Sequence, residues 1–185
     1  MGSSPVCLAV SARTKLNRNR SKGWGQMKAD IRTLFKIQCG LFTAGCELNG
    51  EANACICNTL LEQSHMPVRL SVTLGKDHLT HDMVMEKRSV CVCALAESFS
   101  MDIIRRFGFA SGRDQDKFAG IAYKTDCNGN PYLDDPAMIA ARFSLSVYDT
   151  VDVGTHTLFL CTVDDMEDYA SNALTYSGYR DGIRK

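Results

Sequence analysis

Alternating apolar and polar positions in this 185-residue chain predict a protein built mainly from β-strands. In residues 68–74 every second side chain is apolar and polar side chains lie between, which is the period of a strand with one buried face. Residues 90–94 are apolar throughout, which indicates a strand buried on both faces. Three further strands are predicted at residues 138–141, 143–151 and 156–163.

Two short helices are predicted between the strands. Residues 80–87 and 101–109 have apolar side chains at helical spacing, and Thr80 is placed to cap the start of the first helix. The apolar side chains crowded into residues 31–43 indicate a short helical turn that leads into a strand.

The predicted turns favour a barrel. Asn49 and Gly50, within a turn at residues 45–52, are the strongest local signal for a hairpin, and a strand resumes at Ala54. Five to seven strands with two or three short helices indicate a mainly β fold, a closed or partly closed antiparallel barrel. A doubly wound sheet is disfavoured because no long alternation of strands and helices is present.

Charge and composition narrow the class of protein. Lysine plus arginine equals aspartate plus glutamate at 21 each, which argues against a nucleic-acid-binding or membrane-surface protein. Residues 1–26 carry basic but no acidic side chains and show no apolar period, so we expect a disordered basic extension before a single domain at residues 27–185. Met27 is a plausible second translation start. The extension either contributes nothing to function or serves as a partner-binding arm.

The nine cysteines suggest reduced thiols and a cytoplasmic protein, because their number is odd and no secretory signal precedes them. Cys55 with Cys57 and Cys91 with Cys93 raise the question of a four-thiolate metal site. Zinc sites usually place two or more residues between paired cysteines, however, so small buried cysteines in a barrel wall explain the pairs better, and no metal is predicted.

Two polar segments have side chains suited to a ligand. Ser111 and Gly112, followed by Lys117, form a loop suited to an anionic or planar ligand; an exposed turn held by an ion pair of Arg113 with Asp114 or Asp116 is the alternative.

Lys76 lies close to Thr80 and His81, where donors near a helix start can hold a phosphate. His156 follows a glycine turn into an apolar strand, and it either faces a ligand or is a core residue hydrogen-bonded to a neighbour. Phosphate-binding Gly-rich loops and the Gly-x-Ser-x-Gly signature are absent, which disfavours a Rossmann dehydrogenase and a serine hydrolase.

Taken in order, the motifs resemble the flavin reductase-like family of FMN-binding split β-barrels. The resemblance extends from about Leu34 to Tyr176 and rests on the following segments: Cys57-Asn-Thr59, a strand led by Pro67, Lys76 followed by Thr80-His-Asp82, Phe107-Gly-Phe-Ala-Ser-Gly-Arg-Asp-Gln-Asp-Lys-Phe118, Gly154-Thr-His-Thr-Leu-Phe159 and Leu174-Thr-Tyr176.

The resemblance implies an antiparallel split barrel of Greek-key type and a homodimer with one FMN near each subunit interface. It places Asn58 and Thr59 at the flavin ring or ribityl chain. A further set of residues is expected at the phosphate or around the ring: Lys76, Thr80, His81, Ser111, Gly112, Lys117 and His156. No catalytic acid or base is obligatory, because the flavin itself carries the redox chemistry, and His156 is the one candidate.

Three functions are compatible with these observations. The first is an oxidoreductase that passes electrons from NADH or NADPH through FMN to a second acceptor. The second is an FMN electron-transfer module reduced by a protein such as a rubredoxin; the chain ends at Lys185 without paired Cys-x-x-Cys motifs, so a rubredoxin is expected to be a separate partner. The third is a non-catalytic protein that binds haem or a pyridoxal-type cofactor.

Overall fold

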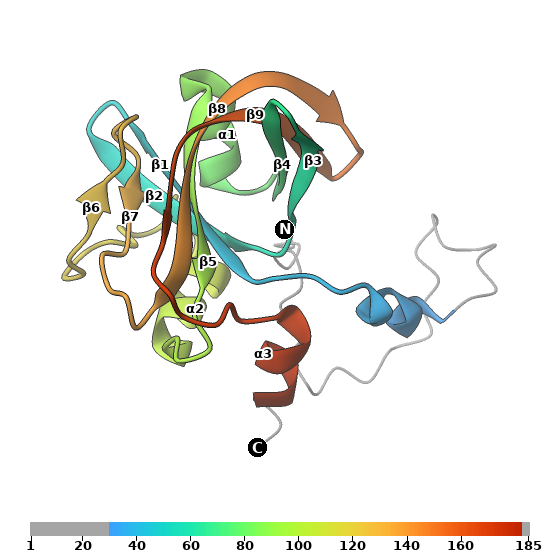
Figure 1. The fold of residues 1–185 in the computed structure, drawn as a ribbon. Helices are drawn as coiled ribbons and strands as arrows, with labels where there is room; N and C mark the ends of the chain where they lie inside the picture. The colour runs from blue at the N-terminus through green and yellow to red at the C-terminus, as the bar shows by residue number, and fades with distance from the viewer. Residues whose placement is uncertain (1–29, 183–185) are drawn as a thin grey trace.

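A computed structural model describes residues 30–182 as one seven-stranded antiparallel sheet curved into a split β-barrel with short helices around it (Figure 1). The expected N-terminal extension and the start at Met27 lie outside the described residues. The strands of the main sheet, in spatial order, are β2 (Glu51–Cys57), β1 (Phe42–Leu48), β5 (Ser89–Leu95), β8 (Ile139–Asp152), β9 (His156–Asp168), β4 (Val68–Gly75) and β3 (Leu60–His65). The mainly β prediction is therefore confirmed.

The hairpin between β1 and β2 turns at the predicted dipeptide. Asn49 and Gly50 have φ values of 56° and 85°, the left-handed conformation that a two-residue hairpin turn needs. The turn is tighter than the predicted 45–52 segment, because β1 continues to Leu48 and β2 resumes at Glu51 rather than at Ala54.

Strand β8 corrects the prediction of two strands at residues 138–141 and 143–151, which it joins into one 14-residue strand. The two predicted segments leave out Arg142, whose charged side chain is unusual inside a buried strand. Its guanidinium is instead paired with Asp165 at 2.8 Å and Glu167 at 3.0 Å on the neighbouring strand β9. The charge is neutralised across the sheet, and the strand continues.

Three strands were not predicted. Edge strand β3 has mostly exposed side chains and therefore lacks a clear apolar period. The other two, β6 (Lys124–Thr125) and β7 (Pro131–Tyr132), form a two-residue ladder around the turn at residues 126–130. Strands as short as these have no periodicity to detect.

Three α-helices and a 3₁₀ turn, η1 (Ile31–Lys36), accompany the sheet. Helix α2 (Met101–Phe109) begins and ends as predicted. Helix α1 (Leu79–Lys87) differs in its start: His78 is the N-cap, so the prediction that Thr80 caps this helix is wrong. Helix α3 (Tyr176–Gly182) ends the described chain, and none of the helices in residues 30–182 is long and apolar enough to cross a bilayer.

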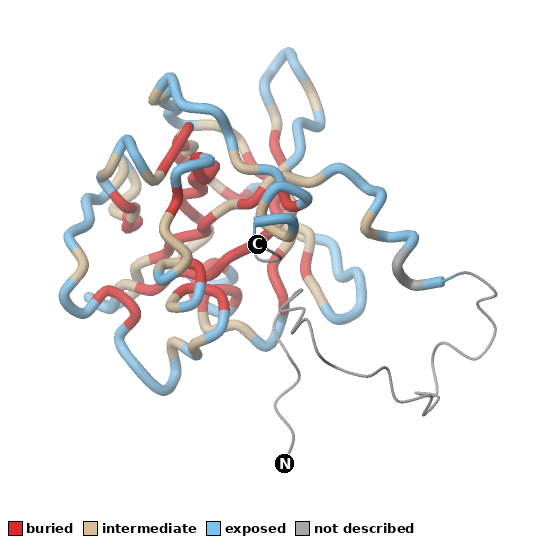
Figure 2. The backbone as a smooth tube through the Cα atoms, turned by 90° about the horizontal axis from the view of Figure 1, so that it is seen from below, coloured by how far each residue is buried: buried red, intermediate tan, exposed pale blue. Residues whose placement is uncertain are grey.

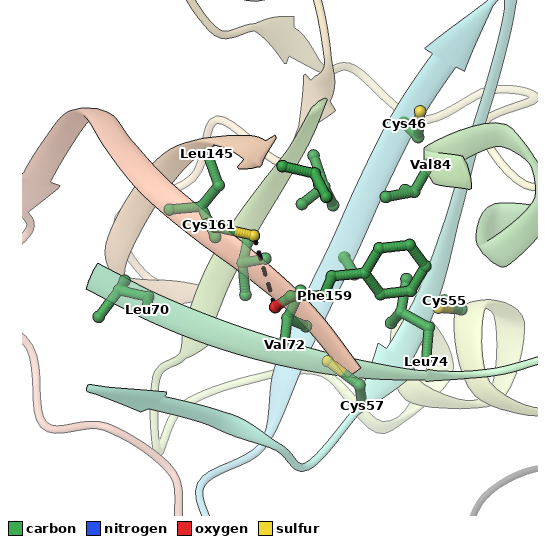
Figure 3. Packing of buried hydrophobic residues seen from close by; sticks show 14 of the residues in the cluster. Cys46, Cys55, Cys57, Leu70, Val72, Leu74, Val84, Leu145, Phe159 and Cys161 are labelled. Atoms are coloured by element: carbon green, nitrogen blue, oxygen red, sulfur yellow. Dashed lines mark hydrogen bonds between the residues drawn. The ribbon is translucent and has the colours of Figure 1, made fainter. Parts of the chain in front are cut away.

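Buried residues gather in the middle of the molecule, and exposed residues form its outer loops (Figure 2). The main core fills the barrel around Phe159, where apolar side chains from six strands and α1 meet (Figure 3). A second core, which includes Phe107 and Phe118, lies between β2 and helix α2. Strand β2 therefore contributes side chains to both cores, since Cys55 and Cys57 enter the first and Ala54 and Ile56 the second.

Cys55 and Cys57 face one side of the sheet, and Cys91 and Cys93 face the other side. Ala44 of β1 lies opposite both Cys55 and Val92, so Cys55 shares a face with Val92 and not with its neighbour Cys91. All four thiols of the two pairs are buried, and Cys91 with Cys93 belongs to a separate cluster around Ile139. The four sulfurs therefore do not converge on one site.

Candidate functional site

A cleft of about 710 Å³ opens where the start of α1 meets the end of α2 and the loop after it. Its floor is Cys55 of β2, and one wall is formed by residues 77–79. Residues 107–114 and Lys117 form the opposite wall. Loop glycines and polar side chains thus surround an apolar floor, the usual make-up of a small-molecule site.

His78 is the unexplained polar side chain of this cleft. It lies at the start of α1, its side chain is 11% exposed, and neither Nδ1 nor Nε2 has a hydrogen-bond partner among the described residues. The closest charged atom recorded for it is Oδ1 of Asp77, at 3.7 Å from Nε2, which is too long for a hydrogen bond. Burial lowers the pKa of His78, which favours the neutral imidazole.

Lys117 supports the opposite wall of the cleft. The side chain is buried, and its Nζ donates to the carbonyl oxygens of Ala54 at 2.9 Å and Phe107 at 3.1 Å. These bonds join strand β2 to the end of helix α2. Burial lowers the pKa of the ammonium group, but an ammonium has three N–H donors, so one is left for a ligand.

The loop of residues 111–117 approaches strand β2 closely at Gly112. A Cβ at this position would lie 2.7 Å from Cγ and 2.8 Å from Nδ2 of the buried Asn53, and still closer to Oδ1. Asn53 in turn donates from Nδ2 to the hydroxyl of Thr80 at 2.9 Å. Only glycine therefore fits between the cleft and this buried hydrogen bond.

A second chain of hydrogen bonds ties the loop to the barrel. Thr157 on β9 contacts Nε2 of His81 at 2.8 Å, and Nδ1 of His81 contacts Oδ1 of Asp82 at 3.0 Å. Oδ2 of Asp82 accepts from Arg113 at 2.6 Å. The alternative in which Arg113 pairs with Asp114 or Asp116 is therefore wrong, because its partner is 31 positions away.

The predicted phosphate residues have protein partners of their own. Lys76 forms an ion pair with Asp152 at 2.7 Å, and Thr80 and His81 are buried in the hydrogen bonds described above. His156 lies at the start of β9 opposite Gly75, with Nδ1 at 2.8 Å from the hydroxyl of Thr155.

Three of the nine predicted residues line the cleft, namely Ser111, Gly112 and Lys117. Asn58 and Thr59 lie at the turn between β2 and β3, where the Thr59 hydroxyl donates to Oδ1 of Asn58 at 3.0 Å, and they do not line it.

His78, Cys55 and Asp82 were missed as site residues. The signal for His78 was present in the sequence, since it lies between Lys76 and Thr80, but local spacing alone does not tell which of these side chains faces the cleft.

A second cleft of about 580 Å³ lies on the other side of the same loop. Gly112, Arg113 and Asp114 line both clefts, and the side chains of Met83 and Tyr123 contribute to the second one. The loop therefore separates two clefts, and a change in its position alters both.

A split barrel with a polar cleft beside its helices is the arrangement found in a class of oxidoreductases. Comparison with known proteins identifies the family. Residues 35–182 match the family model described as "Flavin reductase like domain". The chain therefore belongs to the flavin reductase-like family and is an oxidoreductase of that type.

Two curated relatives are each 35% identical to the chain. The ferric-chelate reductase (NAD(P)H) of Archaeoglobus fulgidus is matched over 81% of this chain and 88% of its own length. The high molecular weight rubredoxin of Moorella thermoacetica is matched over 74% of this chain. The match spans only 58% of that rubredoxin's length.

Solved structures share the fold at lower sequence identity. The NADH:FAD oxidoreductase SgcE6 of Streptomyces globisporus superposes with a TM-score of 0.71 at 19% identity, covering 80% of this chain and 86% of that chain. The flavin reductase PheA2 superposes with a TM-score of 0.66 at 21% identity, covering 80% of this chain and 93% of that chain. These likenesses establish the split-barrel fold.

Proposed function

We propose that the protein binds FMN in the cleft of about 710 Å³ and passes electrons from NADH or NADPH through it to a second acceptor. The observation that carries the proposal is His78, whose imidazole lines this cleft and whose two ring nitrogens are buried without a hydrogen-bond partner within residues 30–182. Buried polar atoms without partners are rare in native proteins, and a bound ligand accounts for this one.

The residues present fit FMN. The cleft volume lies within the roughly 300–1,000 Å³ typical of cofactor sites. Its floor and one edge are apolar at Cys55, Leu79 and Phe107, which suits a planar ring system. His78, the hydroxyl of Ser111 and the ammonium of Lys117 supply donors for polar groups of the ring, the ribityl chain or the phosphate.

In this proposal the chain's own residues bind, orient and shield. Bound FMN would accept a hydride from the reduced nicotinamide and release the two electrons to the acceptor. Lys117 holds one wall by its two carbonyl contacts, and the bond between Arg113 and Asp82 keeps the loop against helix α1. His78 contacts the ligand from the opposite wall. No protein acid or base is required for the hydride step.

An electron-transfer module is the second candidate. The similarity to the high molecular weight rubredoxin favours it, because that similarity covers 74% of this chain. In that case FMN stays bound, a rubredoxin-type partner reduces it, and no nicotinamide site is needed.

Several finer points of the proposal follow from the family resemblance. We propose a cytoplasmic homodimer whose FMN lies near the subunit interface. Asn58, Thr59 and His156 do not line the cleft of one chain, so contact with FMN requires an extended ligand or the second subunit. Light scattering of the protein with FMN gives its mass in solution, and a monomer contradicts the dimer.

An absorption spectrum tests the proposed function. FMN is added to the purified protein, and NADH and then NADPH are added without oxygen. Binding followed by bleaching of the flavin band supports the reductase. Binding with no bleaching by either nucleotide favours the electron-transfer module, and no binding at all refutes both.

A further inference from the structure

We propose that a further cleft, on the outer side of helix α2, binds the adenylate half of the nicotinamide nucleotide and selects NADPH over NADH by its 2′-phosphate. The inference rests on the proposed function, since it names the electron donor. This arginine cleft has a volume of about 550 Å³, and its lining residues belong to α2 or to the loop after it: Asp102, Arg105, Arg106, Phe109, Ala110, Gln115 and Asp116.

The arginine cleft adjoins the cleft proposed to bind FMN. Phe109 and Ala110, at the end of α2, line both of them. A nicotinamide nucleotide consists of two nucleotides joined through a pyrophosphate. A molecule with its nicotinamide in the FMN cleft and its adenylate beyond Phe109 therefore occupies both clefts at once.

Phe109 is a large apolar side chain at the junction of the two clefts. It is 50% exposed, whereas Phe107, two positions earlier, is buried in the second core. Exposed aromatic rings are surfaces on which nucleotide bases stack. Arg105 and Arg106 precede Phe109 by four and three positions, so they are its neighbours on the surface of the helix. The ring thus offers a place for adenine, with cations beside it for a phosphate on the adjoining ribose.

The two arginines differ in their partners. Nη1 of Arg105 is paired with Oδ1 of Asp102 at 2.9 Å. Within residues 30–182, the recorded partners of Arg106 are backbone carbonyl oxygens, those of Asp116 at 3.5 Å and of Ala119. A carbonyl oxygen accepts a hydrogen bond without neutralising the guanidinium, which has five N–H donors. Arg106 therefore keeps its positive charge and has donors left for an anion.

The acidic groups of the cleft are engaged by the chain itself. Asp102 is paired with Arg105, and Oδ1 of Asp116 accepts from the backbone N–H of Phe118 at 2.8 Å. The C-terminal end of a helix carries partial negative charge, so an anion needs a cation to bind there. A phosphate monoester carries about −1.5 to −2 charges and three acceptor oxygens, which suits the planar fork of Arg106.

Isothermal titration calorimetry with adenylate fragments tests the proposal on the full chain in the presence of FMN. Adenosine 2′,5′-bisphosphate is compared with its 3′,5′ isomer, which has the same charge, and with 5′-AMP, which lacks the second phosphate. None of these fragments carries electrons, so the titration is independent of any redox activity.

Arg106→Gln is the test variant, because glutamine keeps N–H donors but loses the positive charge. Arg69→Gln is the matched control: its guanidinium lies 4.8 Å from the ring centre of Tyr148, and Arg69 lines none of the three clefts described. Phe109→Leu removes the aromatic ring and keeps an apolar side chain.

We expect the wild type to bind the 2′,5′ isomer at least about fivefold more tightly than the 3′,5′ isomer, since only the former places its phosphate at Arg106. Arg106→Gln should weaken binding of the 2′,5′ isomer about tenfold, the size expected for losing a hydrogen bond to a charged group, and 5′-AMP by less than about twofold. Phe109→Leu should weaken all three fragments alike, and Arg69→Gln should match the wild type. In steady-state assays Arg106→Gln should raise the KM for NADPH and leave that for NADH unchanged.

The possible failures are distinguishable. Equal binding of the two isomers to the wild type overturns the 2′-phosphate site. An equal loss of the 2′,5′ isomer and 5′-AMP in Arg106→Gln also overturns it, because Arg106 then shapes the cleft without contacting that phosphate. Failure of FMN to bind, or of NADPH to bleach it, refutes the proposed function itself, and the fragment titrations still decide whether the cleft holds a 2′-phosphate.

Discussion

Gly112→Ala tests the idea that a close backbone approach shapes the cleft proposed to bind FMN. The added Cβ would lie 2.7 Å from Cγ of Asn53 and 2.8 Å from its Nδ2, closer than non-bonded carbon and nitrogen atoms tolerate. Asn53 is 4% exposed and is held by its bond to Thr80, so it has little freedom to move aside. Either the loop shifts away from strand β2 or the bond between Asn53 and Thr80 breaks.

Both outcomes have a predictable magnitude. Overpacking a buried contact costs about 1–3 kcal/mol, and leaving a buried polar group without a partner costs a similar amount. We take about 2 kcal/mol for the loss in the free energy of unfolding, which lowers the melting temperature by about 4–8 °C in a domain of this length. FMN affinity should fall as well, because Gly112 lines the cleft.

The assay is urea unfolding followed by FMN titration. Gly182→Ala is the matched control, because no atom lies within 4 Å of a Cβ at that position. The double variant Asn53→Ala with Gly112→Ala completes a double-mutant cycle, in which the cost of Gly112→Ala should nearly vanish once the amide is gone. A Gly112→Ala protein as stable as the wild type, or an equal cost of Gly112→Ala when Asn53→Ala is already present, would refute the reasoning.

Three further predictions concern the loop and the barrel. Asp82→Asn weakens the bond to Arg113 and should lower FMN affinity a few-fold in a fluorescence titration. Its cost in the free energy of unfolding should be less than about 1 kcal/mol, because the ion pair is half exposed. Asp102→Asn is the control: it breaks a similar surface pair and should leave FMN affinity unchanged. Burial raises the pKa of Asp82, but the bonds of its carboxylate to the imidazole of His81 and to Arg113 outweigh this effect and hold the pKa below the usual 3.8. The difference in stability between the wild type and Asp82→Asn is therefore expected above pH 4 and should disappear as the pH falls through the folded-state pKa. A difference that grows in acid contradicts this assignment. Gly45→Ala drives a Cβ onto the backbone carbonyl oxygen of Pro131, so thermal unfolding should show a loss of about 3 kcal/mol, and a stable variant shows that β1 and β7 lie further apart than described.

The strands were largely predictable because their signal is local. The segments predicted at residues 68–74 and 90–94 correspond to strands β4 and β5, and the helix predicted at residues 101–109 corresponds to α2. These predictions succeeded because the period of apolar side chains depends only on neighbouring positions. The prediction of strand bounds failed where a residue has its partner far along the chain. Arg142 was left out of both predicted segments, but it lies inside β8, where Asp165 and Glu167 neutralise it from 23 and 25 positions away.

The candidate site was predicted less completely for the same reason. The sequence placed Lys76, Thr80 and His81 in one short segment of donors, but their partners come from far along the chain. Thr80 is bonded by a residue 27 positions away, and His81 by one 76 positions away. A polar side chain that already has such a partner has fewer hydrogen-bonding groups left for a ligand.

The amino-acid sequence by itself determined a mainly β domain and, through the order of its motifs, the family. Its apolar period decides which segments form strands, because burial of one strand face depends on alternation along the strand. Only the tertiary structure decided that His78, rather than the donors on either side of it, faces the cleft with both ring nitrogens unbonded among the described residues. That choice depends on which polar groups meet across the folded barrel, and hydrogen bonds between distant residues leave no trace in local sequence.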